Sequence, residues 1–322
     1  MLRGKFVHYI IRAAACLLMV ATSASVFAQA SAKSFVVVDA QSGHILLRSN
    51  EDAKLPVASL TKVATAMVVL DWADVSKQNL AERVVLPFSI ERIGGANPVG
   101  LQPGDTVSLR DLLYAALMQS DNRAAYTLSL FVGSRLADTT EAASAEIAFI
   151  KQMNALARSL EMKRTGFVNA HGLDQEKGGL STAEDMARLA QYALGHRGFL
   201  FYGSQPNRQI TIERAGQPMV LSLTNTNELL GTRMIGSVET KIDGLKTGMT
   251  AKAGACVIIT TERPPLAKKI GATTEVTPRR LIVVVLGSND RFGIATNLLA
   301  QGWNAYEAWA QQGRPIKKSQ SL

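Results

Sequence analysis

Ser59 and Lys62 are three positions apart in Ala58-Ser59-Leu60-Thr61-Lys62, beside an apolar run with helical spacing. Residues three apart share one face of a helix, so the hydroxyl and the amine are expected to lie side by side. A serine hydroxyl needs a neighbouring base before it can attack a carbonyl carbon. The pair therefore suggests acyl transfer through a serine nucleophile.

Two later motifs strengthen this interpretation. Ser120-Asp121-Asn122 follows a second amphipathic run, and Lys246-Thr247-Gly248 comes later in the chain. A Ser-x-x-Lys tetrapeptide alone is a weak signal, because it often arises by chance. The three motifs in this order are more specific, since together they are the signature of penicillin-recognising serine enzymes.

Lysine is the expected base. His44, His171 and His196 are expected in a turn, a loop and a helix end, as surface or loop residues without suitable neighbours. A free lysine has a pKa of about 10.4, so Lys62 can act as a base near neutral pH only if burial and a nearby cation lower that pKa. Lys246 could supply the cation. The spacing of His, Asp and Glu predicts no metal site, and we expect no cofactor.

The catalytic roles follow from these residue types. Lys62 would deprotonate Ser59, which attacks a carbonyl, and Ser120 would relay a proton toward the leaving amine. The backbone amides of Ser59 and Met249 would hold the developing oxyanion.

Substrate binding is assigned to the strand that carries the third motif. Lys246 and Thr247 can bind a substrate carboxylate. Gly248 would let the substrate approach the strand edge closely, as glycine in a strand often does.

Helices are expected around the first two motifs. The run after Ser59 is apolar on nearly every side, which predicts a buried central helix that withdraws Lys62 from bulk water. A capping box at Ser108-x-x-Asp111 begins a helix that ends before Ser120, so this serine is expected in a loop. Further helices are predicted over residues 142–160, from a cap at Ser181-x-x-Glu184 to near Gly195, and over residues 291–311.

Strands are expected at both ends of the chain. Residues 35–38 and 45–47 predict an N-terminal hairpin. Later strands are predicted over residues 208–213, 219–223, 253–261 and 281–286, with residues 262–280 as an exposed excursion between the last two. This order predicts a mixed α/β fold of the α+β type, in which an antiparallel sheet is completed by both termini and helices pack on it.

The first residues have the features of a secretory signal peptide. Positive residues precede an apolar run that ends in Val26-Phe27-Ala28, so residues 1–28 are predicted to be removed on export. A membrane anchor is a weaker alternative because polar residues shorten the run below the ~20 residues of a span. Lipid attachment at Cys16 matches its motif poorly. Residues 29–311 are expected to form the catalytic domain, residues 312–322 a basic solvated tail, and the protein to reside in the periplasm.

The charge is modestly positive. The formal net charge of +9 falls to +6 when Arg3, Lys5 and Arg12 leave with the signal peptide, which contains no acidic residue. Such a balance suits anionic surfaces, and a weak attraction of the tail to the cell wall or membrane is a lesser alternative to simple solvation. The basic residues are scattered without aromatic interleaving, so nucleic acid is not an expected partner.

With these three motifs in this order, the chain resembles the low-molecular-mass penicillin-binding proteins, which are the D-Ala-D-Ala carboxypeptidases and endopeptidases of serine peptidase family S11. The likeness covers residues 34–310 and rests on residues 55–70, 116–125, 166–173, 180–183, 225–227 and 244–254. It implies the DD-peptidase and β-lactamase fold, peptidoglycan peptides as substrates and β-lactams as covalent inhibitors. By resemblance, Ser59, Lys62, Ser120, Asn122, Lys246 and Thr247 take the acylating roles, with Asn122 bonded to the substrate amide.

Within the family, two features resemble the D-alanyl-D-alanine endopeptidase branch, of the penicillin-binding protein 7 type. The second motif is Ser120-Asp121-Asn122 where carboxypeptidases usually carry Ser-Gly-Asn, and no β-rich second domain is expected. The arginine that carboxypeptidases use for the terminal carboxylate has no clear match, and Arg291 is a weak candidate. We therefore expect an endopeptidase, with a carboxypeptidase as the alternative.

Two other functions are less favoured. Class A β-lactamases share the three motifs but need a loop glutamate that activates water. No matching Glu-x-x-x-Asn follows Ser120, and Glu161 lacks that context, so acylation by penicillin without fast turnover is expected. An inactive penicillin-binding scaffold is disfavoured because all three motifs are intact.

Overall fold

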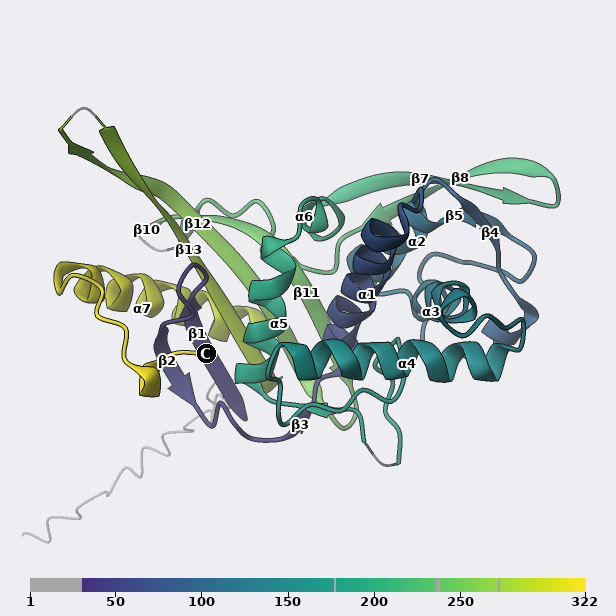
Figure 1. Cartoon of the computed structure of the whole chain (residues 1–322), viewed down its shortest axis with the longest axis horizontal. Coiled ribbons are helices and arrows are strands. Elements are labelled where there is room, and N and C mark those ends of the chain that lie inside the picture. Colours follow the sequence, from purple (N-terminus) through teal and green to yellow (C-terminus); the bar gives the residue numbers. More distant parts are fainter. Residues whose placement is uncertain (1–30, 177, 236–237, 272) are drawn as a thin grey trace, which may run out of the picture.

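The computed structural model describes residues 31–176, 178–235, 238–271 and 273–322, so the predicted signal peptide lies outside the described residues. An antiparallel sheet of five strands, in the order β11-β12-β13-β1-β2, is the main sheet (Figure 1). Its strands are β1 (Ser34–Asp39), β2 (Ile45–Ser49), β11 (Lys241–Thr250), β12 (Gly254–Ile270) and β13 (Thr273–Ser288). The N-terminal hairpin thus joins strands from late in the chain, which confirms the predicted sheet.

Alternating side chains of this sheet build two separate cores, as the period of a strand requires. Val284 belongs to a core shared with α1 (Thr61–Ser76) and α5 (Ala183–Gly195). Its neighbours Val283 and Val285 face the other way and pack with Leu299 and Trp303 of α7 (Arg291–Gln311). Because the central strands are buried on both faces, their sequences are continuous apolar runs.

Helix α1 is buried on nearly every side, as its sequence predicts. It packs against α2 (Leu109–Met118), α3 (Asn122–Ala137) and α4 (Ala142–Ser159). The predicted cap of α2 is present, since the Ser108 hydroxyl accepts a hydrogen bond from the Asp111 amide at 3.0 Å. This helical layer lies beside the main sheet (Figure 1).

Shorter elements complete the described chain. They are β3 (Leu55–Pro56), η1 (Ala58–Leu60), β4 (Arg83–Val85), η2 (Phe88–Arg92), β5 (Thr106–Ser108), β6 (Leu180–Ser181), α6 (Phe199–Gly203), β7 (Asn207–Arg214), β8 (Gln217–Thr224), β9 (Met234–Ile235), β10 (Val238–Glu239) and η3 (Lys318–Gln320). Within the described ranges, no helix has both the length and the apolar character needed to cross a membrane.

Two local predictions were wrong. Helix α5 is capped by Thr182, whose hydroxyl accepts from the Asp185 amide at 3.0 Å, and Ser181 lies in β6 with its hydroxyl 2.7 Å from that of Thr165. Most described side chains of residues 262–280 are exposed, as predicted, but these residues are not an excursion between two strands, because β12 and β13 continue as a paired hairpin as far as Ile270 and Thr273. Prolines in this stretch are tolerated there at an irregularity in the pairing.

The tail after α7 is only partly solvated. Lys317 and Lys318 are exposed, as expected. The chain then returns to the body, where the Leu322 amide donates to the Gly43 carbonyl at 3.0 Å. Nearby His44 is buried and stacks on Trp309 with ring centroids 4.3 Å apart, so the surface position predicted for this histidine was wrong.

Candidate active site

Ser59 lies in the short η1 turn, and Lys62 follows one turn later in α1. The Lys62 side chain is fully buried. Its Nζ donates to Asn122 Oδ1 at 2.8 Å and to the His171 carbonyl oxygen at 2.6 Å, and lies 2.8 Å from Ser59 Oγ. The predicted pairing of hydroxyl and amine is therefore present in the structure.

An ammonium can donate in all three contacts, and a neutral amine can make them with the Ser59 hydroxyl as the donor in the third. A neutral amine has two N–H donors and one lone pair, which can accept the Ser59 hydroxyl proton. Burial lowers the pKa of Lys62 to about 7, since it disfavours the charged form, while the carboxylate of Asp121 acts in the opposite direction. A lysine with this pKa can serve as a general base near neutral pH.

Burial lowers the pKa of Lys62 as predicted, but the prediction that Lys246 supplies a second cation for this shift was wrong. Burial, not a second cation, dominates at Lys62. Repulsion between cations instead affects Lys246. Burial is the largest cause that holds the pKa of Lys246 well below its usual range, and the charges of Lys62 and Arg291 add to it. Both lysine amines are thus poorly solvated, and protonation of one disfavours protonation of the other.

The second motif forms the turn into α3. Ser120 has a left-handed backbone with φ +62°, and Asp121 caps α3 by accepting from the Ala124 amide at 2.9 Å. Asn122 is held between Lys62 and the loop that follows η2, because its Nδ2 donates to the Gly94 carbonyl at 3.2 Å. The Ser120 hydroxyl makes no hydrogen bond within the described residues, so its relay role stays a prediction.

The third motif lies on β11, one of the two edge strands of the main sheet. Lys246 and Thr247 are both buried, and Lys246 Nζ donates to the Thr247 carbonyl at 2.9 Å. The Thr247 hydroxyl is 2.6 Å from the hydroxyl of Thr226, which belongs to the Asn-Thr-Asn segment that braces this strand. The side chain of Met249 is exposed, and the oxyanion role of its amide stays a prediction.

Close approach to the nucleophile requires glycine at two positions. A Cβ at Gly248 would lie 3.0 Å from the Ser59 amide nitrogen, so glycine lets β11 lie directly against the nucleophile's own turn. A Cβ at Gly172, whose φ is +82°, would lie 2.0 Å from the Ala58 carbonyl oxygen. Ala58 itself has φ +50°, a strained conformation held immediately before Ser59.

His171 is a site residue that sequence reasoning missed. It lies in a loop, as predicted, but it is buried, and its backbone carbonyl rather than its ring contacts Lys62. Burial, together with the Lys62 charge, lowers the pKa of the His171 imidazole to about 3. The ring is therefore neutral at physiological pH, and Nδ1 accepts from the Leu173 amide at 3.2 Å.

Arg291 also lies at the site, although the sequence supported it only weakly. Its Nη1 donates to the Gly248 carbonyl at 3.0 Å, and its charge acts on Lys246. Arg291 provides positive charge beside the third motif. Within the described ranges, no group of three or more His, Cys, Asp or Glu side chains is arranged to hold a metal ion.

A change at Asp121 should move the pH dependence of acylation. We expect the rate of reaction with benzylpenicillin to rise with pH through about 7, as Lys62 loses its proton. Asp121→Asn keeps an oxygen for the α3 cap but removes the carboxylate that raises the Lys62 pKa, so the midpoint should fall. Stopped-flow labelling between pH 5 and 9 measures it, with Asp138→Asn at the other end of α3 as control. A midpoint that rises in Asp121→Asn contradicts the assignment.

Comparison with known proteins agrees with this geometry. The family profile described as Peptidase S11, D-alanyl-D-alanine carboxypeptidase, matches residues 19–289. The carboxypeptidase DacC of Escherichia coli is 32% identical over 284 residues, 86% of this chain and 62% of that protein. The D-alanyl-D-alanine endopeptidase of Pseudomonas aeruginosa is 32% identical over 269 residues, 82% of this chain and 75% of that protein.

A solved structure shows the same fold. Penicillin-Binding Protein D2 of Listeria monocytogenes, in its cefotaxime-bound form, has a TM-score of 0.62 and 31% identity, covering 84% of this chain and 97% of that one. The chain spans less than two thirds of the length of DacC, and relatives named carboxypeptidase and endopeptidase both match it. Because the family profile covers most of the sequence, this chain belongs to serine peptidase family S11.

Proposed function

We propose that this protein is a serine DD-peptidase that cleaves D-alanyl peptide bonds of peptidoglycan in the periplasm through an acyl-enzyme. The observation that carries the proposal is the buried Lys62 amine, 2.8 Å from the Ser59 hydroxyl and with its pKa lowered to about 7. Lys62 takes the Ser59 proton as Oγ attacks the D-alanyl carbonyl carbon. The carbon–nitrogen bond then breaks, the leaving amine takes up a proton relayed by Ser120, and water later cleaves the ester.

The other motif residues bind the substrate in this proposal. Asn122 donates to the substrate amide, and Lys246 and Thr247 bind a carboxylate, with Gly248 between them and the nucleophile's turn. The backbone amides of Ser59 and Met249 stabilise the oxyanion. A β-lactam would acylate the same serine, in line with the cefotaxime-bound form of the Listeria protein.

The specific activity we propose is that of an endopeptidase, which opens cross-links. The Ser120-Asp121-Asn122 motif and the likeness to the Pseudomonas endopeptidase support it. A carboxypeptidase is the second candidate because Arg291 lies beside Lys246 and adds a cation that suits a free terminal carboxylate.

Product analysis separates these two activities. Mature protein is incubated with a purified cross-linked tetrapeptide dimer and, separately, with a monomeric pentapeptide, and the products are identified by mass spectrometry. The proposal expects monomers from the dimer, with the pentapeptide little changed. Loss of terminal D-alanine from the pentapeptide alone makes the protein a carboxypeptidase, and no cleavage of either substrate contradicts the peptidase function.

A further inference from the structure

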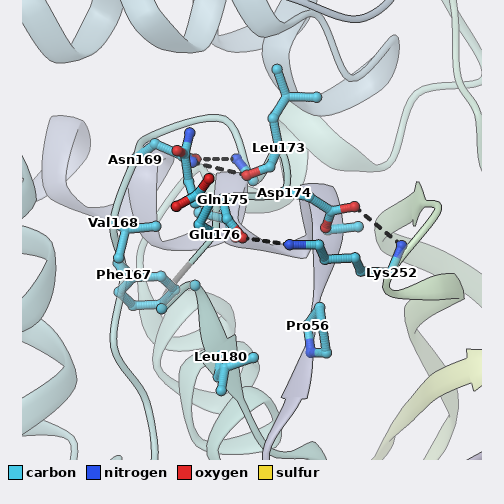
Figure 2. Close-up of a pocket in the computed structure, with 15 residues that line it drawn as sticks. Pro56, Phe167, Val168, Asn169, Leu173, Asp174, Gln175, Glu176, Leu180 and Lys252 are labelled. Carbon is cyan, nitrogen blue, oxygen red and sulfur yellow. Dashed lines mark hydrogen bonds between the residues drawn. The ribbon is translucent and has the colours of Figure 1, made fainter.

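One carboxylate near the active site takes no part in the proposed reaction. Asp174 lies on the loop that carries His171 and Gly172, and within the part of the chain that the structure describes it forms no ion pair. Its carboxylate instead accepts from the Thr250 hydroxyl at 2.8 Å. Figure 2 shows its second bond, from the Lys252 amide at 3.1 Å. These two hydrogen bonds, called here the Asp174 tie, join the loop to the end of β11 and the turn that follows.

Both ends of the Asp174 tie are themselves fixed. The Thr250 hydroxyl also accepts from the Ala253 amide at 3.1 Å, which closes the turn after β11. On the loop, Asn169 Oδ1 accepts from the Gly172 amide at 2.6 Å, and Asn169 Nδ2 donates to the Leu173 carbonyl at 3.0 Å. The tie therefore fixes the position of one braced segment relative to another.

The two segments position the amides that are proposed to hold the oxyanion. Met249, directly before Thr250 on β11, supplies one amide. Ser59 supplies the other, and its turn rests on the loop, since a Cβ at Gly172 would lie 2.0 Å from the Ala58 carbonyl oxygen. An oxyanion must lie about 2.7–3.1 Å from each donor. The separation of the two segments thus decides whether both bonds can form.

We infer that Asp174 is a positioning residue that sets the separation between the oxyanion donors, the amides of Ser59 and Met249. The inference rests on the proposed function, because it concerns the oxyanion of the acylation step. Asp174 acts through Thr250 and the turn after β11, not by contact with the substrate. Without the tie, β11 is free to move away from the loop, and the oxyanion keeps only one of its two bonds.

The Asp174 tie depends on hydrogen-bond geometry and not on charge. The nearby Lys252 ammonium does not pair with the carboxylate but donates to the Gln175 carbonyl at 2.7 Å (Figure 2). An asparagine could accept from the Lys252 amide through Oδ1 and donate to the Thr250 hydroxyl through Nδ2, because a hydroxyl is both donor and acceptor. Asp174→Asn should therefore keep the tie, whereas Asp174→Ala removes it.

Rates of acylation by benzylpenicillin compare these variants. We expect Asp174→Ala to react roughly 100-fold more slowly than wild type, which is the lower end of the effect of losing one oxyanion donor, and Asp174→Asn to stay within about threefold. Thr250→Val removes one of the two bonds and should slow acylation less, so it tests the inference even if Asp174→Ala does not fold. Combined with Asp174→Ala, it should add little, because both changes remove the same tie.

Asp39→Ala is the matched control for stability. Asp39 also accepts from a backbone amide and a hydroxyl, both of Ser42, at 2.8 and 2.6 Å, but in the turn between β1 and β2. Its loss should lower stability in denaturant unfolding without slowing acylation. Equal slowing in Asp39→Ala and Asp174→Ala would reflect a general loss of stability and would overturn the inference.

The ester carbonyl of the acyl-enzyme reports the oxyanion donors directly. Its stretching band is measured by infrared difference spectroscopy with benzylpenicillin isotopically labelled at the β-lactam carbonyl carbon. Hydrogen bonds to a carbonyl oxygen lower its stretching frequency. We expect the band to move to higher frequency in Asp174→Ala and to keep its wild-type position in Asp174→Asn and Asp39→Ala.

The outcomes separate the two possible failures. If Asp174→Ala keeps both the wild-type rate and the wild-type band, Asp174 does not position the donors, and the peptidase function stands. A slower rate with an unchanged band also overturns the inference, because the donors are then still aligned. If folded wild-type protein forms no acyl-enzyme with benzylpenicillin, the proposed function is refuted, and the inference with it.

Discussion

Lys62→Ala should slow acylation of Ser59 by benzylpenicillin by roughly 10³-fold, within the range that general bases contribute. The amine is 2.8 Å from Ser59 Oγ, and its lowered pKa leaves much of it neutral at physiological pH. Without it, no other side chain within the described residues hydrogen-bonds to the Ser59 hydroxyl. The second-order rate constant from stopped-flow or quenched labelling measures the effect.

A fold control must accompany this variant, because it leaves the acceptors Asn122 Oδ1 and the His171 carbonyl without a donor. Lys62→Met keeps a long unbranched side chain and should be just as slow, which separates loss of the base from loss of packing. Lys151→Ala, at an exposed position on α4, should react like wild type. If folded Lys62→Ala and Lys62→Met label within about threefold of wild type, Lys62 is not the base.

Gly172→Ala should impair both stability and acylation. Its Cβ would lie 2.0 Å from the Ala58 carbonyl oxygen, so the turn that carries Ser59 must move, and φ +82° is unfavourable for alanine. We expect the free energy of unfolding to fall by about 2–4 kcal/mol. Acylation should slow by roughly 100-fold, since misplacing a reacting group by about 1 Å has such effects.

Gly216→Ala is the matched control for this change. Gly216 also has a positive φ, +76°, but a Cβ there meets no atom within 4 Å. Gly216→Ala should therefore introduce backbone strain without a steric clash. We expect a smaller loss of stability than in Gly172→Ala and an unchanged acylation rate. Denaturant unfolding and penicillin labelling measure both variants. If Gly172→Ala and Gly216→Ala behave alike, the contact between Gly172 and Ala58 does not position the nucleophile.

Local sequence patterns predicted the elements whose cause is local. The all-round apolar run after Ser59 predicted the buried α1, and the Ser108 cap predicted the start of α2. Spacing also predicted that Ser59 and Lys62 would lie together, because one helical turn joins them. The cap of α5 was misassigned because Ser181 and Thr182 are adjacent and both suit that position.

Features that depend on contacts between distant segments could not be predicted from local sequence patterns. His171 contributes a backbone carbonyl, which any residue type could supply. Arg291 reaches β11 from the start of α7, and only the folded sheet brings them together. The long hairpin of β12 and β13 was obscured by its prolines and lysines, because both residue types are depleted in strands.

The most direct test of the central claim is to locate the covalent adduct of benzylpenicillin. Mature protein is labelled, digested and mapped by tandem mass spectrometry, with Ser59→Ala treated in parallel. The account predicts one penicilloyl group on Ser59 and none on the variant. An adduct on another residue, or equal labelling of folded Ser59→Ala, would contradict it.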